Sequence, residues 1–168
     1  MYQKGAAVTM LTASHRFQGE IRTGGQRLQE VLNNSLSDFV HVDATQIFTL
    51  IDQETELRAT SMTTVQKSQL QLVLIDEQKH EAPTKRNNYH VQKNFYEVFC
   101  VVGNYEVQGY IHLPRYTRDT IAILVRDIKL FFPLTEATII YDVGKRSTLN
   151  AGVVLVNKSA LSLFQIMD

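Results

Sequence analysis

Short stretches of alternating apolar and polar residues recur along the chain, separated by glycine and polar turns, which favours a β-rich fold. Segments 7–12 and 17–22 are rich in strand-forming residues and lie close enough to form a hairpin. Segments 96–102 and 105–113 repeat this pattern around a Gly-Asn turn. We therefore expect a hairpin near the start of each half of the chain.

A short helix is predicted after each hairpin. In segment 27–34, Leu28, Val31 and Leu32 form one apolar stripe at helical spacing, and a pair of asparagines follows as a stop signal. The matching segment 118–124 contains more β-branched residues, so its helical pattern is weaker.

Two further strands are predicted in each half, so that each half reads ββαββ with mostly antiparallel pairing. These strands span about 39–51 and 63–75 in the first half, and about 138–141 and 152–166 in the second, with polar loops over 52–60 and 142–150.

Three sequence blocks recur in the same order, which indicates an internal repeat. Gly109 follows Gly19 by 90 residues, Ala137 follows Ala44 by 93, and Lys158 follows Lys67 by 91, each within a similar local sequence. We interpret the chain as a tandem duplication of one small ββαββ unit. The first repeat spans 6–75, a polar linker spans 76–94, and a second, more divergent repeat spans 95–168.

A unit of about 70 residues buries too little apolar surface to be stable alone, and its sheet has two edges. We therefore expect the two copies to share a core or to join edges. The fold class is α+β and β-rich, with each unit an open antiparallel sheet or a small curled barrel carrying one short helix.

The first repeat resembles a family of small bacterial β-rich proteins of unknown function, over about residues 8–50. The resemblance lies in Thr12, His15, Phe17, Gly19 and Ile21, followed by the stretch Arg27-Leu28, Glu30 and Leu32-Asn33 and a strand near Phe39. The second copy lacks the leucine-asparagine pair. The resemblance supports a repeated small β unit, but the family offers no known activity to carry over and adds no catalytic residue.

Composition narrows the class of protein. Hydrophobic residues make up 44% of the 168, and 17 basic residues balance 17 acidic ones, so the charge excess typical of a dedicated nucleic-acid binder is missing. Cys100 is the single cysteine, which excludes an internal disulfide. The first 16 residues do not read as a signal peptide, and no apolar run is long enough to span a bilayer. We expect a cytoplasmic protein.

Few residue patterns suggest chemistry. His41 and Asp43 share one strand face, where they would serve as metal ligands or as an oriented base, but a solvated strand face is the favoured interpretation. Cys100 lies in an apolar strand and is interpreted as a buried hydrophobic residue rather than a nucleophile. None of the histidines (15, 41, 80, 90 and 112) has zinc-site spacing.

Lys67-Ser68 and Lys158-Ser159 occupy matching places in the two copies, but adjacent strand residues point to opposite faces, so a turn or a strand entry is favoured over a catalytic dyad. Segment 23–26, Thr-Gly-Gly-Gln, lacks the phosphate-binding glycine patterns and is interpreted as a strand-to-helix turn.

Basic residues gather with a tyrosine in segment 85–93, to which Arg115, Arg118, Arg126 and Lys129 add. Such a strip would hold single-stranded nucleic acid on a small barrel, although a solvated linker is the favoured interpretation.

The leading hypothesis is a non-enzymatic protein-interaction, scaffold or assembly module, with no catalytic, cofactor-binding or metal-binding residue assigned. It would bind itself or another protein through sheet edges or apolar faces. The alternatives are a nucleic-acid-binding small β-barrel, which the charge balance does not favour, and a small-ligand sensor that binds between the repeats.

Overall fold

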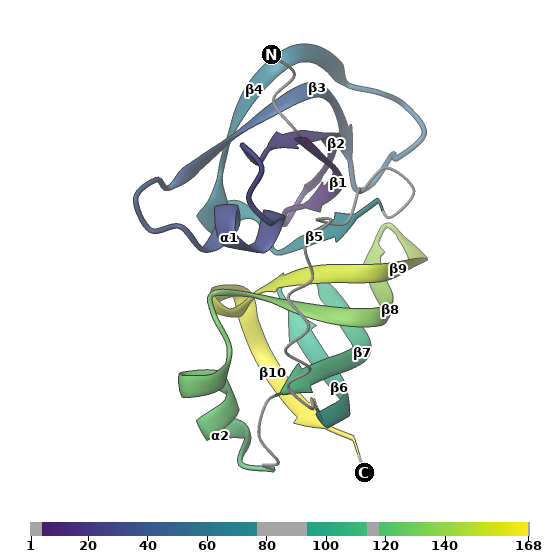
Figure 1. Ribbon diagram of the computed structural model, residues 1–168. Coiled ribbons are helices and arrows are strands. Elements are labelled where there is room, and N and C mark those ends of the chain that lie inside the picture. The colour runs from purple at the N-terminus through teal and green to yellow at the C-terminus, as the bar shows by residue number, and fades with distance from the viewer. Residues whose placement is uncertain (1–4, 77–93, 114–117, 168) are drawn as a thin grey trace.

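The computed structural model of the protein describes residues 5–76, 94–113 and 118–167. Its ten strands form one antiparallel sheet in the order β10-β6-β7-β8-β9-β5-β1-β2-β3-β4, which curls around two cores (Figure 1). The expected β-rich α+β class is therefore confirmed. The predicted linker over 76–94 lies outside the described residues, apart from its two ends.

The first half contains five strands, a helix and a 3₁₀ turn. The helix α1 is amphipathic as predicted, because Leu28 and Leu32 are buried against the sheet. The elements are β1 (Gly5–Leu11), β2 (His15–Arg22), α1 (Leu28–Asn33), β3 (Phe39–Thr49), β4 (Arg58–Gln66), η1 (Lys67–Gln69) and β5 (Leu72–Ile75).

The second half has the same sequence of strands, with a weaker helix. Asp119 caps a three-residue helix, which continues as one π-helical turn whose Ile123 is buried. The elements are β6 (Asn94–Val102), β7 (Tyr105–Leu113), α2 (Thr120–Ala122), η3 (Ile123–Asp127), β8 (Phe131–Val143), β9 (Lys145–Asn157), η4 (Lys158–Ala160) and β10 (Leu161–Ile166).

Each half has one strand more than predicted. The single strands expected over 63–75 and 152–166 are each divided by a 3₁₀ turn, which begins at Lys67 in the first half and at Lys158 in the second. Each turn begins with a polar Lys-Ser pair and contains no glycine or proline, so the strongest turn signals are missing. The interpretation of the two Lys-Ser pairs as turns is confirmed, whereas the unbroken strands expected across them are wrong.

The loop predicted over 142–150 is also wrong, because β8 and β9 form one long hairpin that turns at Gly144 (φ 73°). The polar residues of this segment belong to a solvated part of the hairpin, since β5 pairs only with residues near the far end of β9, Val154 to Val156. A polar composition therefore reflected exposure rather than a loop.

The strands pair in the same order in both halves: β5-β1-β2-β3-β4 and β10-β6-β7-β8-β9. Both halves also contain a β-bulge in the third strand, at Ala44 (φ 47°) and Glu136 (φ 51°). These two residues are 92 positions apart, so the structure pairs Ala44 with Glu136 rather than with Ala137 as the sequence blocks suggested.

The bulge explains why glycine occurs in the facing strand. A Cβ on Gly19 would lie 2.7 Å from Val42 Cγ1 and 2.8 Å from the Asp43 carbonyl oxygen. A Cβ on Gly109 would lie 3.0 Å from the Thr135 carbonyl oxygen. The recurring glycine thus marks a close approach of two backbones.

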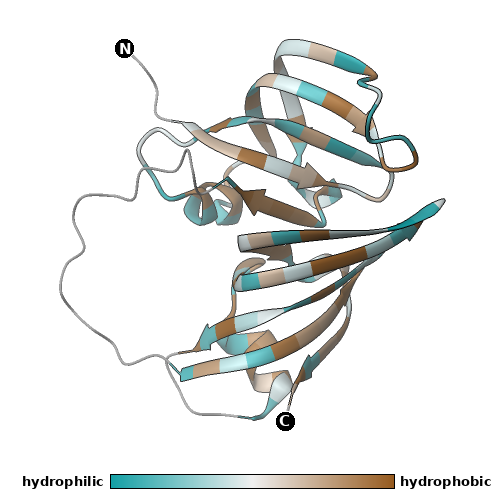
Figure 2. Cartoon of the chain, turned by 90° about the vertical axis from the view of Figure 1, so that its right-hand side faces the viewer, coloured by the Kyte–Doolittle hydropathy of each residue, from teal (hydrophilic) through white to brown (hydrophobic). Residues whose placement is uncertain are grey.

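The two cores interlock where the halves meet. The core of the first half includes Phe131 and Leu155 from the second half, and the core of the second half includes Leu11, Leu50 and Leu72 from the first. Figure 2 shows β5 in hydrophobic colours beside β9 at this boundary. The halves therefore bury apolar surface jointly, as the thin core of one unit led us to expect.

Candidate functional site: joined and free sheet edges

Two strands end the sheet. Among the described residues, β4 pairs only with β3, and β10 pairs only with β6. Backbone groups on the outer side of an edge strand are free to pair with another chain, so edges are sites of strand addition. The two edges also carry partly exposed apolar side chains, with Met62 on β4 53% exposed and Leu163 on β10 44% exposed.

Inside the molecule, the edge strand of one half already pairs with the edge strand of the other. β5, the fifth strand of the first half, pairs antiparallel with β9, the fourth strand of the second half. All six paired residues are apolar and buried: Leu72 with Val156, Val73 with Leu155, and Leu74 with Val154. We call this contact the internal junction.

The helix of the first half reinforces the internal junction. The side-chain amide of Asn33 donates to the Phe131 carbonyl oxygen at 2.8 Å, and its carbonyl oxygen accepts the Phe131 N–H at 2.8 Å. Gln29 donates to the same carbonyl oxygen at 3.3 Å. Asn33 thus pairs with the first residue of β8 as a neighbouring strand would, and the Phe131 side chain is fully buried.

A buried asparagine connects the two halves at the end of β9. Asn157 is 0% exposed; its backbone N–H donates to Gln71 O at 3.0 Å, and its Nδ2 donates to Leu70 O at 2.7 Å. Its Oδ1 accepts from the N–H of Ser159 at 2.9 Å. A buried amide whose nitrogen and oxygen are both paired specifies one arrangement of the strands around it.

Tyrosines of the second half contact the backbone and side chains of the first. The Tyr105 hydroxyl donates to Thr12 O at 2.7 Å, and Gln53 donates to the Tyr141 hydroxyl. Burial raises the pKa of Tyr105 above its ordinary value, with a smaller contribution from Tyr141, so the phenol stays protonated and acts as a donor.

The lysines of the two 3₁₀ turns have a structural role that the sequence did not reveal. Lys67 Nζ donates to Asn34 O at 2.8 Å, at the end of α1, and Lys158 Nζ donates to Leu124 O at 2.8 Å. Burial lowers the pKa of Lys67, partly offset by Asp38. The signal was present, because the lysines recur in matching blocks, but nothing in the sequence identified their acceptors.

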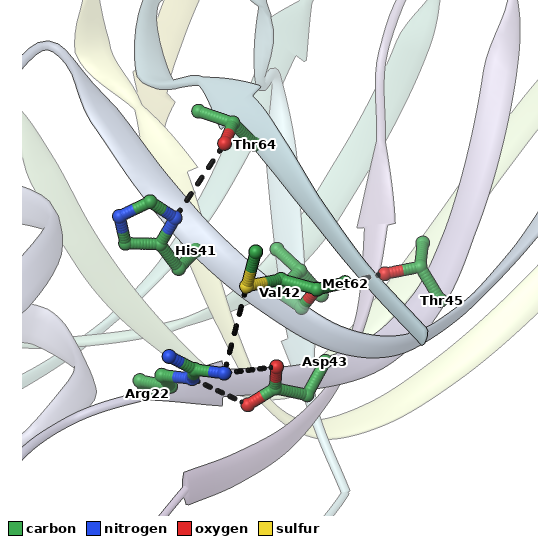
Figure 3. Close-up of polar contacts among 7 residues, drawn as sticks. All are labelled: Arg22, His41, Val42, Asp43, Thr45, Met62 and Thr64. Carbon is green, nitrogen blue, oxygen red and sulfur yellow. Dashed lines mark hydrogen bonds and ion pairs between the residues drawn. The ribbon is translucent and has the colours of Figure 1, made fainter. Parts of the chain in front are cut away.

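Asp43 and His41 have different hydrogen-bonding partners (Figure 3). Asp43 forms a two-pronged ion pair with Arg22, at 2.6 Å and 2.7 Å, and this hydrogen bonding holds the pKa of the carboxyl below its usual value. His41 Nδ1 lies 3.5 Å from Thr64 Oγ1 on the neighbouring strand. The pair is part of a solvated strand face, and sequence spacing alone could not reveal Arg22 as the partner.

Cys100 is fully buried, and burial raises the pKa of its thiol to about 12. The thiol is therefore protonated near neutral pH, whereas nucleophilic cysteines are thiolates. Among the described residues, no three His, Cys, Asp or Glu side chains gather as metal ligands would.

Other predicted positions are dispersed. Segment 23–26 forms the strand-to-helix turn, with Gly24 and Gly25 at positive φ. Segment 85–93 and Arg115 lie outside the described residues. Arg118, Arg126 and Lys129 are exposed, and Arg126 lies within η3. A cavity of about 320 Å³ lies within the first half rather than between the halves, lined in part by Phe17, Ile47 and Thr63.

No family model, curated protein or solved structure matches the chain. The resemblance to small bacterial proteins of unknown function therefore stays a prediction. No helix of the described residues has the length and apolar character needed to cross a membrane.

Proposed function

We propose that this protein is a non-enzymatic assembly module, which binds a protein chain by strand addition at its free edges, β4 and β10. The observation that carries the proposal is the contrast within one sheet: β5 and β9 form a buried edge-to-edge contact, while the sheet ends in two strands that have no second neighbour in the part of the chain that the structure describes.

The composition of the edges supports this function. Proteins that avoid association shield their edges with lysine, proline or very short strands. Here β4 is nine residues long and β10 six, and between them they contain one basic residue, Arg58, and no proline. The formal net charge of zero adds no long-range repulsion between copies.

A non-enzymatic role is part of the proposal because the reactive side chains that the sequence offered have other tasks. Asp43 binds Arg22, and Cys100 packs in the core. We also propose that the two halves arose by duplication of one unit, which is supported by their common strand order, the bulges at Ala44 and Glu136 and the lysine that begins each 3₁₀ turn. A cytoplasmic location belongs to the same proposal.

The function is tested by placing charge on the edges. Thr64→Lys in β4 and Leu163→Lys in β10 each place a positive charge at an exposed edge position. The control is Gln108→Lys, which adds the same charge at an exposed position of β7, a strand with neighbours on both sides. Sedimentation of the purified protein over a range of concentrations measures self-association. Crosslinking in cells, followed by identification of the crosslinked peptides, locates any other partner.

We expect the edge variants to lose association, or their crosslinks to an identified partner, while Gln108→Lys retains both. The proposal is wrong if the purified chain stays monomeric at every concentration and no crosslinked peptide comes from β4 or β10. It is also wrong if all three variants associate equally well.

A further inference from the structure

The two free edges are a fourth strand and a fifth strand, as are the two edges that are joined inside the molecule. The strand order runs fifth-first-second-third-fourth in each half, and the fourth strand of one half meets the fifth strand of the other at the internal junction. Among the described residues, the strands left without a second neighbour are the fourth strand of the first half, β4, and the fifth strand of the second half, β10. Placing β10 of one molecule beside β4 of the next continues the strand order without interruption.

We propose that molecules of this protein associate head to tail, with β10 of one copy pairing antiparallel to β4 of the next and repeating the internal junction. This inference rests on the proposed function and commits its partner to a second copy of the chain. The internal junction supplies the geometry, because its two strands correspond to β10 and β4 position by position.

The register follows from the two 3₁₀ turns. They begin at Lys67 and Lys158, so residues around them correspond at a spacing of 91. Strand pairing within each half supports this correspondence. In both halves, the residue before the turn faces the first residue of the third strand: Gln66 faces Phe39, and Asn157 faces Phe131.

Transferring the internal pairs by this spacing gives the pairs of the new junction. Val73 with Leu155 becomes Phe164 with Thr64 of the next copy, Leu72 with Val156 becomes Leu163 with Val65, and Leu74 with Val154 becomes Gln165 with Thr63.

The backbone directions at the free edges fit this register. Lys67 N–H donates toward β3, to Asp38 O, and Met167 N–H donates toward β6, to Glu97 O. Because N–H directions alternate along a strand, the N–H groups three positions earlier, on Thr64 and Phe164, point outward. In the internal junction, Asn157 N–H donates to Gln71 O, so the pair two positions away, Leu155 with Val73, is also a hydrogen-bonded pair. Thr64 and Phe164 are the residues that correspond to it.

Apolar side chains are left exposed at the places that this association would cover. Phe131, at the start of the third strand of the second half, is 0% exposed because α1 of the first half lies against it. Its counterpart Phe39 is 50% exposed. The helical segment that corresponds to α1 carries Ile121 and Val125, each 72% exposed. Head-to-tail pairing would bring that segment of one copy toward Phe39 of the next.

The new junction is more polar than the internal one, since Thr63, Thr64 and Gln165 replace buried aliphatic residues. We therefore expect association to be reversible and to depend on concentration. The contact is heterologous, so it closes into a ring when the rotations between units sum to a full turn and forms an open chain otherwise.

Disulfide trapping tests the register directly. Thr63 and Gln165 correspond to a pair that is not hydrogen-bonded, where Cα atoms lie about 4.5 Å apart, within the range that a disulfide of about 4.4–6.8 Å spans. We would mix the single variants Thr63→Cys and Gln165→Cys under mild oxidation. The buried Cys100 does not compete. Ser61→Cys, two residues along the same exposed edge, is the register control.

We expect the mixture of Thr63→Cys with Gln165→Cys to form a disulfide-linked dimer. This dimer should be at least tenfold more abundant than in the control mixture of Ser61→Cys with Gln165→Cys. The double variant should give a single defined mass for a ring, or a ladder of masses for a chain. Each result supports head-to-tail pairing.

Equal crosslinking of either single variant with itself would overturn the inference in favour of two-fold pairing, as would equal crosslinking with Ser61→Cys. Absence of any crosslink would also overturn it. The edge variants Thr64→Lys and Leu163→Lys would then test the proposed function by themselves. If they lose binding to a different, identified protein, the proposed function holds with that protein as the partner, although the head-to-tail inference fails.

Discussion

The internal junction and the free edges are built from corresponding strands, yet they differ in composition. At the internal junction, six aliphatic residues pair, Phe131 is buried under α1, and Asn157 bonds across the boundary. At the free edges, Thr63, Thr64 and Gln165 occupy three of the six corresponding positions, and Phe39 is half exposed. The same strand geometry therefore forms a permanent contact where aliphatic area is buried, and leaves an accessible edge where it is not.

The largest expected contrast between these regions concerns the two phenylalanines. Phe131→Ala should lower the free energy of unfolding by about 3–5 kcal/mol, because it leaves a cavity between the cores. Phe39→Ala should lower it by about 1 kcal/mol or less, because the side chain is half solvated. Urea denaturation at low protein concentration measures both values, and similar losses would contradict the assignment of Phe39 to an open edge.

The correspondence of the halves is tested at the bulges. Gly19→Ala should destabilise the protein by about 1–3 kcal/mol, because the added methyl meets both Val42 and a backbone oxygen. Gly109→Ala should cost less, since its nearest contact is 3.0 Å rather than 2.7 Å. Thermal unfolding of the two variants gives the comparison, and a larger loss for Gly109→Ala would contradict the bulge geometry.

The buried asparagine gives a further contrast. Asn157→Ala should lower the free energy of unfolding by about 1–3 kcal/mol, because the Leu70 carbonyl loses its side-chain partner. The corresponding edge residue Gln66 is exposed, so Gln66→Ala should change stability by about 0.5 kcal/mol or less. Chemical denaturation checks both, and an unchanged midpoint for Asn157→Ala would show that the amide is dispensable.

The smallest expected effect is the acid dependence of the ion pair beside β4. The pKa of Asp43 is lowered in the folded protein, chiefly by hydrogen bonding to Arg22. The pair therefore stabilises the protein above the ordinary aspartate pKa of about 3.9, and that contribution is lost as the pH falls through the lower, folded-state value.

Asp43→Asn should remove this part of the pH dependence and leave the rest of the acid limb unchanged. Unfolding measured from pH 5 downward makes the comparison with the parent protein. An identical pH profile would mean that the ion pair adds nothing to stability, as many exposed pairs do.

Much of the local structure could be predicted from the sequence. Alternation located the hairpins, the stripe at Leu28 and Leu32 located α1, and the matching blocks around Gly19 and Lys67 marked features that recur in the second half. Two errors concern strand boundaries. Unbroken strands were expected across the two Lys-Ser turns, which contain no glycine or proline. A loop was expected where the β8–β9 hairpin is polar because it is solvated. Local composition reports exposure as much as conformation.

The amino-acid sequence by itself determined that strands would form, where the helix would lie, and that one unit would bury too little apolar surface alone, because these follow from periodicity and chain length. Only the tertiary structure decided which edges are joined and which are free, that Asn33 holds Phe131, and that Asp43 pairs with Arg22. Such contacts join residues distant in the chain, and their partners depend on strand register and on the bulges that set it.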